Sequence, residues 1–290
     1  MSSQEGPQFY YHQYDGMYYT SLFPKESLDQ IKATAFNDDD LAVVTYPKCG
    51  STWMQAIVSL ISNGVDERAF DENSLHRNFI FLESQFPGFP RDIERWTDSS
   101  AHLLKTHLHA EFFEKTLNES KTKFIVVFRN PKDALISYYH FYRMNSSFAF
   151  NGEWSDFFHL YKDKKLHSGD YFQSTLSWWK WRKDPRVLII RFEDLMESPE
   201  ECVKKVMDHM GKSLSDEAVG RIVEKTSFKS LKDNPMTNYK DVPYMKQEIS
   251  PFFRKGQVGD WKSQLTDDES EYIDQLVAQH FKPVGLTMTE

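Results

Sequence analysis

The chain has 290 residues, of which 40% are hydrophobic, 15% aromatic and 27% charged, and this composition excludes a disordered, collagen-like or coiled-coil protein. A net charge of −8, from 35 basic and 43 acidic residues, disfavours a general binder of nucleic acid or membrane surfaces. With only two cysteines, Cys49 and Cys202, the sequence excludes a disulfide framework or a four-cysteine zinc site and favours reduced thiols in a reducing compartment.

Targeting and membrane segments are not expected from the sequence. Residues 1–19 are polar and rich in tyrosine, without a basic stretch followed by an apolar one. The longest apolar runs, at residues 125–128 and 187–190, have the length of strands, whereas a membrane helix needs about 20 apolar residues. We therefore expect a cytoplasmic protein that neither enters a membrane nor binds nucleic acid.

Four runs of apolar and β-branched residues predict strands. Each run is nearly continuous rather than alternating, which is typical of strands that are buried on both faces of a parallel sheet. The four predicted strands are residues 41–46, 102–107, 123–129 and 187–192.

Helices are predicted between and after these strands. Their signals are apolar spacing near 3.6 residues, and proline or acidic residues in a first turn. They are residues 52–63, 130–145, 198–210, 215–225 and 267–280. The alternation predicts an α/β fold, with a central parallel sheet flanked by helices in a single domain over residues 1–290. Residues 229–259 lack periodicity, and such a long irregular segment is usually functional or disordered.

The loop after the first predicted strand, residues 46–53, has the features of an anion site. A strand ends, a loop with proline and glycine follows and a helix begins, so that free backbone N–H groups face the loop. Lys48 adds a positive charge, Gly50 allows close approach of the backbone, and Ser51 and Thr52 add hydroxyls. The lysine precedes the glycine, so the GxxxxGK[ST] pattern of Mg-nucleotide enzymes is absent. The alternative is a tight turn with a solvated lysine.

Cationic residues also lie at the ends of two other predicted strands. Lys105 and His107 share a strand face, so that one could neutralise charge while the other accepts a proton. Arg129 ends the third strand and suits bidentate binding of phosphate. Taken alone, Lys105 and His107 could be an ordinary exposed pair at a strand end, and Arg129 could form a surface ion pair. Because ligands of open α/β sheets bind at the carboxyl ends of strands, their occurrence together with Lys48 weakens these alternatives.

A basic, glycine-containing group lies in the irregular segment. Arg254, Lys255 and Gly256 precede Gly259, which suggests a lid that closes on an anion or, alternatively, a solvated basic turn. These features occur within longer motifs, which are YPKCGSTW at 46–53, LKTH at 104–107, FRNPKDALISYYHFY at 128–142, FEDL at 192–195, KTSF at 225–228, NPMTNY at 234–239 and RKGQVGDWK at 254–262. In this order they resemble the cytosolic sulfotransferases over nearly the whole chain.

The resemblance implies a sulfotransferase fold with a P-loop-like phosphosulfate-binding loop, and 3'-phosphoadenosine 5'-phosphosulfate (PAPS) as co-substrate, with adenosine 3',5'-bisphosphate (PAP) as product. It places the 5'-phosphosulfate at the loop after the first strand, the 3'-phosphate at the arginines and the lid, and the adenine beside aromatic rings. The residues implied to bind PAPS are Lys48, Cys49, Gly50, Ser51, Thr52, Trp53, Arg129, Ser137, Phe192, Thr226, Phe228, Arg254, Lys255 and Gly256.

Catalytic roles are implied in the same way. His107 is expected to be the general base, Lys105 and Lys48 to stabilise charge on the transferring group and leaving phosphate, and Ser137 to restrain Lys48. No metal is expected, because lysine and arginine take the place that Mg²⁺ fills in kinases. The partner is a small acceptor, such as a phenol, a steroid or another hydrophobic alcohol, or an amine. The residues expected to bind it are Phe81, Lys105, His107, Phe141 and Tyr244.

Four positions depart from the family pattern. Cys49 stands where serine is more frequent, and its thiol is expected either to have a lowered pKa beside Lys48 or to be a small buried residue. Phe192 stands where tyrosine is common, and His109 replaces a common proline near the base. Asp267 replaces the valine of the dimer motif KxxxTVxxxE, so a homodimer is possible but expected to be weakened.

Three other interpretations differ in class. A P-loop-like kinase would need the GxxxxGK[ST] pattern. A catalytically silent protein of the same fold, which binds PAPS or another ligand, would not need the retained Lys48, Lys105 and His107. A carbohydrate sulfotransferase of the secretory pathway would be expected to carry a membrane anchor and more cysteines.

Overall fold

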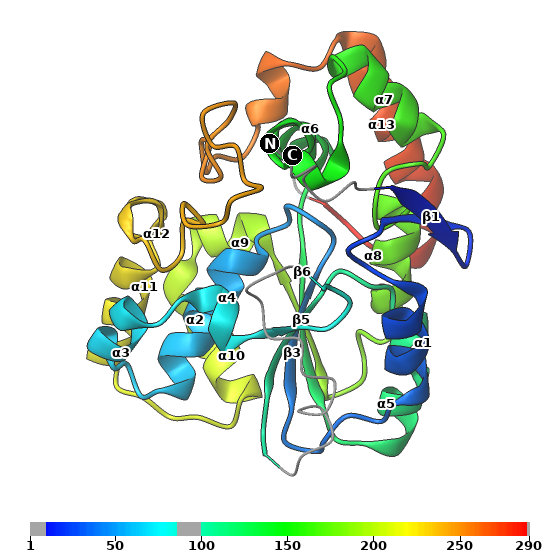
Figure 1. The fold of residues 1–290 in the computed structure, drawn as a ribbon. Coiled ribbons are helices and arrows are strands. Elements are labelled where there is room, and N and C mark those ends of the chain that lie inside the picture. The colour runs from blue at the N-terminus through cyan, green and yellow to red at the C-terminus, as the bar shows by residue number, and fades with distance from the viewer. Residues whose placement is uncertain (1–9, 86–99, 289–290) are drawn as a thin grey trace, which may run out of the picture.

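The computed structural model describes residues 10–85 and 100–288, so the first nine residues of the N-terminal stretch considered above lie outside it. Its centre is a sheet of five parallel strands in the order β4-β5-β3-β6-β7 (Figure 1). The strands are β3 (Leu41–Thr45), β4 (Ile80–Phe81), β5 (Leu103–Thr106), β6 (Lys123–Phe128) and β7 (Val187–Arg191). The four predicted strands and their parallel arrangement are confirmed. Strand β4 was not predicted, because two residues are too few to show a pattern.

A separate antiparallel hairpin lies outside the central sheet. Its strands β1 (Tyr11–Tyr14) and β2 (Met17–Thr20) pair with each other. An isolated bridge between Tyr18 and His167 joins the hairpin to a distant loop.

Helices cover both faces of the sheet. Figure 1 shows one group on the left, formed by α2 (Ser51–Ser62), α3 (Glu67–Glu72), α4 (Leu75–Asn78), α9 (Phe192–Glu197), α10 (Pro199–His209), α11 (Asp216–Lys225) and α12 (Phe228–Asp233). On the right and at the top lie α1 (Lys25–Ala33), α5 (Glu114–Glu119), α6 (Pro131–Met144), α7 (Trp154–Lys162), α8 (Tyr171–Trp179) and α13 (Asp267–His280). Single 3₁₀ turns are η2 (Ala110–Phe113), η3 (Ser146–Phe148), η4 (Asp260–Ser263) and η5 (Lys282–Val284).

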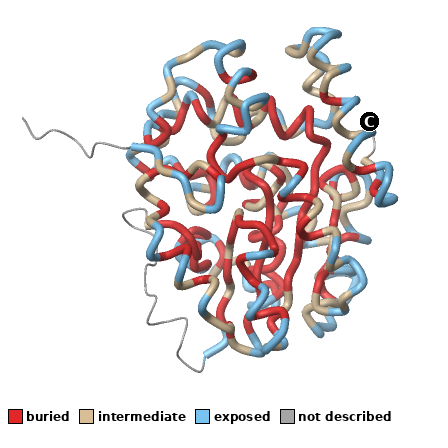
Figure 2. Tube along the Cα trace, turned by 90° about the vertical axis from the view of Figure 1, so that its right-hand side faces the viewer, coloured by how far each residue is buried: buried red, intermediate tan, exposed pale blue. Residues whose placement is uncertain are grey.

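Burial on both faces explains the continuous apolar runs. Along β3, Ala42 and Val44 belong to one buried cluster, whereas Leu41 and Val43 belong to the other. Successive side chains of a strand point to opposite faces, so a sheet with a core on each side needs apolar residues at every position. Figure 2 shows this buried centre, with the exposed residues at the periphery.

Local capping explains where several helices begin. Pro131 occupies the first turn of α6, and the side chain of Asn130 accepts from the N–H of Lys132 at 2.9 Å. Thr266 and Glu269 form a capping box at the start of α13. The five predicted helices are confirmed, and each of their ends lies within one residue of the prediction.

Residues 229–259 are less irregular than expected. Most of α12 (Phe228–Asp233) lies at the start of this segment, and its six residues are too few for a clear periodicity. From residue 234 to η4 the chain forms turns and loops, with one isolated bridge between Asn145 and Met245. Within the described ranges, no helix is long and apolar enough to cross a membrane.

Candidate active site

A cavity of ≈ 370 Å³ lies beyond the carboxyl ends of the strands. It is lined by the loop after β3, the ends of β5 and β6, one side of α6 and the segment before η4. The predicted site residues that line it are Lys48, Gly50, Ser51, Thr52, Trp53, Phe81, Lys105, His107, Arg129, Ser137, Phe141, Phe192, Thr226, Phe228, Tyr244, Arg254, Lys255 and Gly256. The fold thus brings together every predicted site residue except Cys49.

The loop after β3 has an unusual backbone. Lys48 has a positive φ of 69°, and Gly50, the N-cap of α2, has a φ of 102°. A Cβ atom at Gly50 would lie 2.9 Å from Cδ2 of Phe192, so this position needs glycine for both space and conformation. Gly50 has no side chain that could cap α2, so within the described residues the first N–H groups of this helix are available to an anion.

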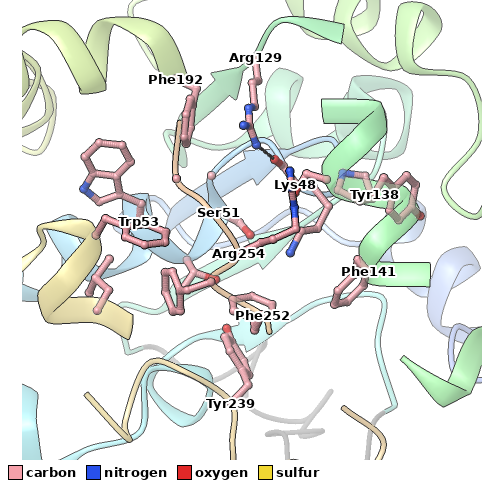
Figure 3. Close-up of a pocket in the computed structure, with 18 of the residues that line it drawn as sticks. Lys48, Ser51, Trp53, Arg129, Tyr138, Phe141, Phe192, Tyr239, Phe252 and Arg254 are labelled. Carbon is pink, nitrogen blue, oxygen red and sulfur yellow. Dashed lines mark hydrogen bonds between the residues drawn. The ribbon is translucent and has the colours of Figure 1, made fainter. Parts of the chain in front are cut away.

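Arg129 is built into the wall of the cavity. Its side chain donates to the carbonyl of Lys48 at 3.0 Å and lies 4.2 Å from the ring centre of Phe192 (Figure 3). Its Nε is buried and has no hydrogen-bond partner in the described part of the chain. A buried donor without an acceptor is costly, so Arg129 is suited to receive an anionic ligand.

Lys48 lies between two aromatic rings. Its Nζ is 4.1 Å from the ring centre of Phe252 and 4.5 Å from that of Phe141. Burial, together with the nearby charges of Arg129, Lys105 and Arg254, lowers the pKa of Lys48 to about 7. A bound polyanion would relieve this repulsion and favour the charged lysine.

The segment that carries the remaining cations is held in place by carboxylates. Asp260 forms ion pairs with Arg254 and Lys255. Asp133, in the first turn of α6, accepts from the backbone N–H of Gly259 at 2.7 Å and of Trp261 at 3.0 Å. This role of Asp133 was not predicted, although the residue lies within the motif at 128–142.

The residues predicted to lie beside the adenine also line the cavity. Trp53 packs edge-on against Phe192, with ring centres 5.6 Å apart. A Cβ atom at Gly256 would lie 2.1 Å from the ring of Phe228, so only glycine fits between that ring and the loop. Thr226 donates its hydroxyl to the carbonyl of Ile222, four residues earlier.

His107 has a defined tautomer. Its Nδ1 lies 2.8 Å from the carbonyl oxygen of Thr45, which can only accept a hydrogen bond, so Nδ1 carries the proton. Nε2 is therefore the basic nitrogen. Burial lowers the pKa of His107 well below 6.5, and the charge of Lys105 lowers it further. The imidazole is thus neutral and able to accept a proton at neutral pH.

Glu83 is a buried carboxylate beside the predicted base, and the sequence analysis missed it. Its Oε1 accepts from the backbone N–H of His107 at 2.6 Å, while Oε2 is buried with no partner among the described residues. Burial raises the pKa of Glu83 to about 7. Burial lowers the pKa of Lys105 to about 8, against the opposing effect of Glu83. No sequence signal singled out Glu83, which follows the two-residue strand β4.

Most of the other residues that line the cavity are apolar or aromatic. Phe81 packs edge-on against His107, with ring centres 5.3 Å apart, and Phe141 packs against Phe148 at 5.6 Å. Phe81, Phe141 and Tyr244 were predicted to lie here. Phe23, Phe148 and His167 also line the cavity but were not predicted.

The hypothesis of an activated Cys49 is wrong. The residue is fully buried outside the cavity lining, and burial raises the pKa of its thiol to about 12. Desolvation outweighs the cations nearby. The alternative interpretation, a small buried residue, describes this position.

The other departures have different outcomes. His109 is buried and, unlike His107, is not among the residues that line the cavity. In the described structure, no hydrogen bond joins Ser137 to Lys48, so the restraint expected of Ser137 stays a prediction. Asp267 begins α13, where an acidic residue stabilises the helix N-terminus. The weakened homodimer also stays a prediction.

Comparison with known proteins identifies the family to which the chain belongs. The family model described as "Sulfotransferase domain" matches residues 38–285. Rat sulfotransferase 1C2 is 36% identical over 257 residues, which cover 88% of this chain and 87% of the relative. Rat sulfotransferase 1A1 is 38% identical over 239 residues, which cover 81% and 82%.

Solved structures share the fold. Mouse sulfotransferase SULT7A1 complexed with PAP has a TM-score of 0.78 at 24% identity, covering 94% of this chain and 95% of that one. Retinol dehydratase in a complex with retinol and PAP has a TM-score of 0.83 at 21% identity, covering 97% and 92%.

A central parallel sheet, with several cationic side chains lining a cavity beyond the carboxyl ends of its strands, defines an α/β protein. The chain belongs to the sulfotransferase family. Membership confirms the expected α/β fold, the enzyme class of a sulfotransferase and the family's co-substrate PAPS.

Proposed function

We propose that this protein transfers a sulfuryl group from PAPS to a hydroxyl, or an amine, of a small apolar acceptor, with His107 as general base. One observation carries the proposal. The hydrogen bond from Nδ1 of His107 to the carbonyl of Thr45 leaves Nε2 as the basic nitrogen, in a cavity with cations on one side and aromatic rings on the other.

The residues at the cationic side fit the anionic donor. Arg129 and Arg254 each have a buried Nε without a partner in the described ranges, and Lys48 has a depressed pKa among neighbouring cations. These groups, with the uncapped start of α2, suit phosphate and sulfonate oxygens. Trp53 and Phe228 offer apolar surfaces to the adenine ring of the nucleotide.

PAPS supplies an activated sulfuryl group whose S–O bond to the 5'-phosphate breaks as the bond to the acceptor oxygen forms. Nε2 of His107 accepts the proton that the acceptor hydroxyl loses. Lys48 and Lys105 neutralise the charge that develops on the leaving phosphate and on the transferring group. The neutral state of His107 suits this task, because a base that is already protonated cannot accept the proton.

The acceptor side favours an apolar molecule. Phe23, Phe81, Phe141 and Phe148 line the cavity near the base, which suits a phenol, a steroid or another hydrophobic alcohol. We place the reaction in the cytoplasm, where the two free buried cysteines would stay reduced. We also propose that the chain acts as one domain, since both core clusters pack on the same sheet.

The test compares two histidines in a transfer assay with labelled PAPS across phenols, steroids, primary alcohols and arylamines. We expect His107→Ala to lower kcat by about 10²- to 10⁴-fold, as for loss of a general base. His109→Ala is the matched control, since His109 is buried outside the cavity lining, and should stay within about threefold of wild type.

A calorimetric titration with PAP separates chemistry from binding. We expect His107→Ala to bind PAP like the wild type, because His107 belongs to the acceptor side. Near-wild-type turnover of His107→Ala would refute its role as base. A wild-type protein that binds PAP but sulfates no acceptor would instead support the catalytically silent binding protein.

A further inference from the structure

A second imidazole lines the cavity, and the reaction described above does not use it. His167 is 3% exposed and packs against Phe23 and Phe148, with ring centres 4.3 and 5.4 Å away. The backbone N–H of His167 donates to the hydroxyl of Tyr142 at 2.5 Å. The backbone carbonyl of His167 accepts from the hydroxyl of Tyr138 at 2.9 Å. These contacts fix the position of the ring.

The hydrogen bonds of His167 also define its tautomer. The backbone N–H of Thr20 donates to Nδ1 at 3.3 Å, so Nδ1 carries no proton. Burial, with a smaller contribution from the charge of His12, lowers the pKa of His167 to about 3, so the ring is neutral. Nε2 must therefore carry the proton and is a hydrogen-bond donor.

This donor is not used within the protein. In the described ranges, Nε2 of His167 makes no hydrogen bond, and it is not among the fully buried atoms without a partner, as Nε2 of His109 is. Because His167 lines the cavity, a molecule bound there can reach Nε2.

An aromatic wall connects the two imidazoles. Phe81 contacts His107, Phe23 contacts Phe81 with ring centres 5.7 Å apart, and His167 contacts Phe23. A flat apolar molecule lying along this wall, with its hydroxyl at His107, would bring another part of its structure to His167.

We propose that His167 is a specificity-determining residue, which donates a hydrogen bond from Nε2 to a second polar atom of the acceptor. The preferred acceptors are then apolar phenols or alcohols that also carry an oxygen or nitrogen able to accept a hydrogen bond, such as a ketone. This inference rests on the proposed function, since it names the substrate class of the same cavity.

The test uses two pairs of phenols that differ only in a ketone. One pair is estrone and the same steroid with its ketone replaced by a methylene; the other is para-hydroxybenzylacetone and para-butylphenol. In both, the ketone is not conjugated with the phenol, so the reacting hydroxyl is unaltered. The affinity of each compound is measured by calorimetry with PAP present, and kcat/KM is measured with PAPS. Binding is thus tested even if turnover fails.

We expect the wild type to prefer the ketone of at least one pair. In His167→Phe, which keeps an aromatic ring but removes the donor, this preference should fall by about 5- to 100-fold. In His167→Gln, the side chain can accept the hydrogen bond from the backbone N–H of Thr20 and still donate one to the ketone. This variant should therefore keep most of the preference for the ketone. The matched control His109→Gln alters a buried histidine outside the cavity lining and should keep it within about twofold.

Two results would overturn the proposal. One is a wild type that prefers neither ketone, and the other is a preference that persists in His167→Phe. A PAP titration and the melting temperature confirm that each variant is folded before its affinities are compared. Failure of sulfation alone, with the ketone preference intact in binding, would contradict the proposed function and leave the role of His167 supported.

Discussion

The cationic and aromatic sides of the cavity are built in different ways. The cationic side is held by directional bonds, such as those from Arg129 to the carbonyl of Lys48 and from Gly259 to Asp133. The aromatic side is held by ring packing between residues from distant segments, such as Phe23 and Phe81. Directional bonds tolerate little change, whereas a packed apolar surface tolerates substitutions that conserve volume. One side is therefore suited to a fixed donor and the other to varied acceptors.

The largest loss of activity on the cationic side is expected at Lys48. In Lys48→Met, the side chain still fits between the rings of Phe141 and Phe252, but its charge is lost. We expect kcat to fall by about 10²- to 10³-fold, as for loss of a group that stabilises the transition state. Steady-state kinetics measure this effect. Lys229→Met, at an exposed lysine of α12, is the control and should stay within about twofold. A loss below fivefold in Lys48→Met would contradict the role given to its charge.

Glu83 lies where the two sides meet. Glu83→Gln keeps an acceptor for the backbone N–H of His107 but removes the charge that holds up the pKa of Lys105. We expect kcat to fall by roughly tenfold. The alkaline limb of the pH–rate profile should move to lower pH, because a smaller fraction of Lys105 stays protonated. The pH–rate profile measures this shift. The exposed Glu119→Gln should follow the wild-type profile, and a superimposable profile for Glu83→Gln would exclude an electrostatic role.

The affinity for PAP is expected to depend on pH through the protonation of Lys48. The pKa of Lys48 is about 7 in the free protein, and a bound polyanion should raise it. Binding above pH 7 then takes up a proton, so affinity should fall as pH rises, by at most about tenfold per pH unit for one group. Calorimetry in buffers of different ionisation enthalpy counts the protons. In Lys48→Met, the affinity for PAP should depend much less on pH between pH 7 and 8. An equally steep dependence in this variant would show that a group other than Lys48 takes up the proton.

The same shift predicts the stability of the free protein. The folded pKa of Lys48 lies below its ordinary value of 10.5, so between about pH 7 and 10.5 the unfolded chain binds more protons than the folded one. The contribution of Lys48 to stability therefore increases as pH rises through this window. Urea unfolding of the wild type and Lys48→Met at several pH values isolates this contribution.

The smallest effect is expected at Phe192. Phe192→Tyr keeps the ring that packs against Arg129 and closes over Gly50. Activity should stay within about threefold, and PAP should bind as well or more tightly, because the variant restores a hydroxyl that is common in the family. A PAP titration checks this. A large loss of affinity would contradict the placement of this ring beside the nucleotide.

Much of the cationic side could be read from short stretches of sequence. The continuous apolar runs predict a parallel sheet, and Lys48, Lys105, His107 and Arg129 each lie next to the end of one of its strands. The carboxyl ends of parallel strands share an edge, so local sequence was sufficient to bring these residues together. The motifs then identified the family.

Other properties depend on contacts between segments far apart in the chain. Burial raises the pKa of Cys49, whereas the sequence predicted a lowered one. The fold also brings the carboxylate of Glu83 to the backbone N–H of His107. The contact between Thr20 and His167 spans 147 positions and defines which imidazole nitrogen is a donor. Sequence alone determined the residue types and the order of the strands along the chain. Desolvation and long-range hydrogen bonds, which exist only in the folded chain, decided protonation states and the lining of the acceptor side.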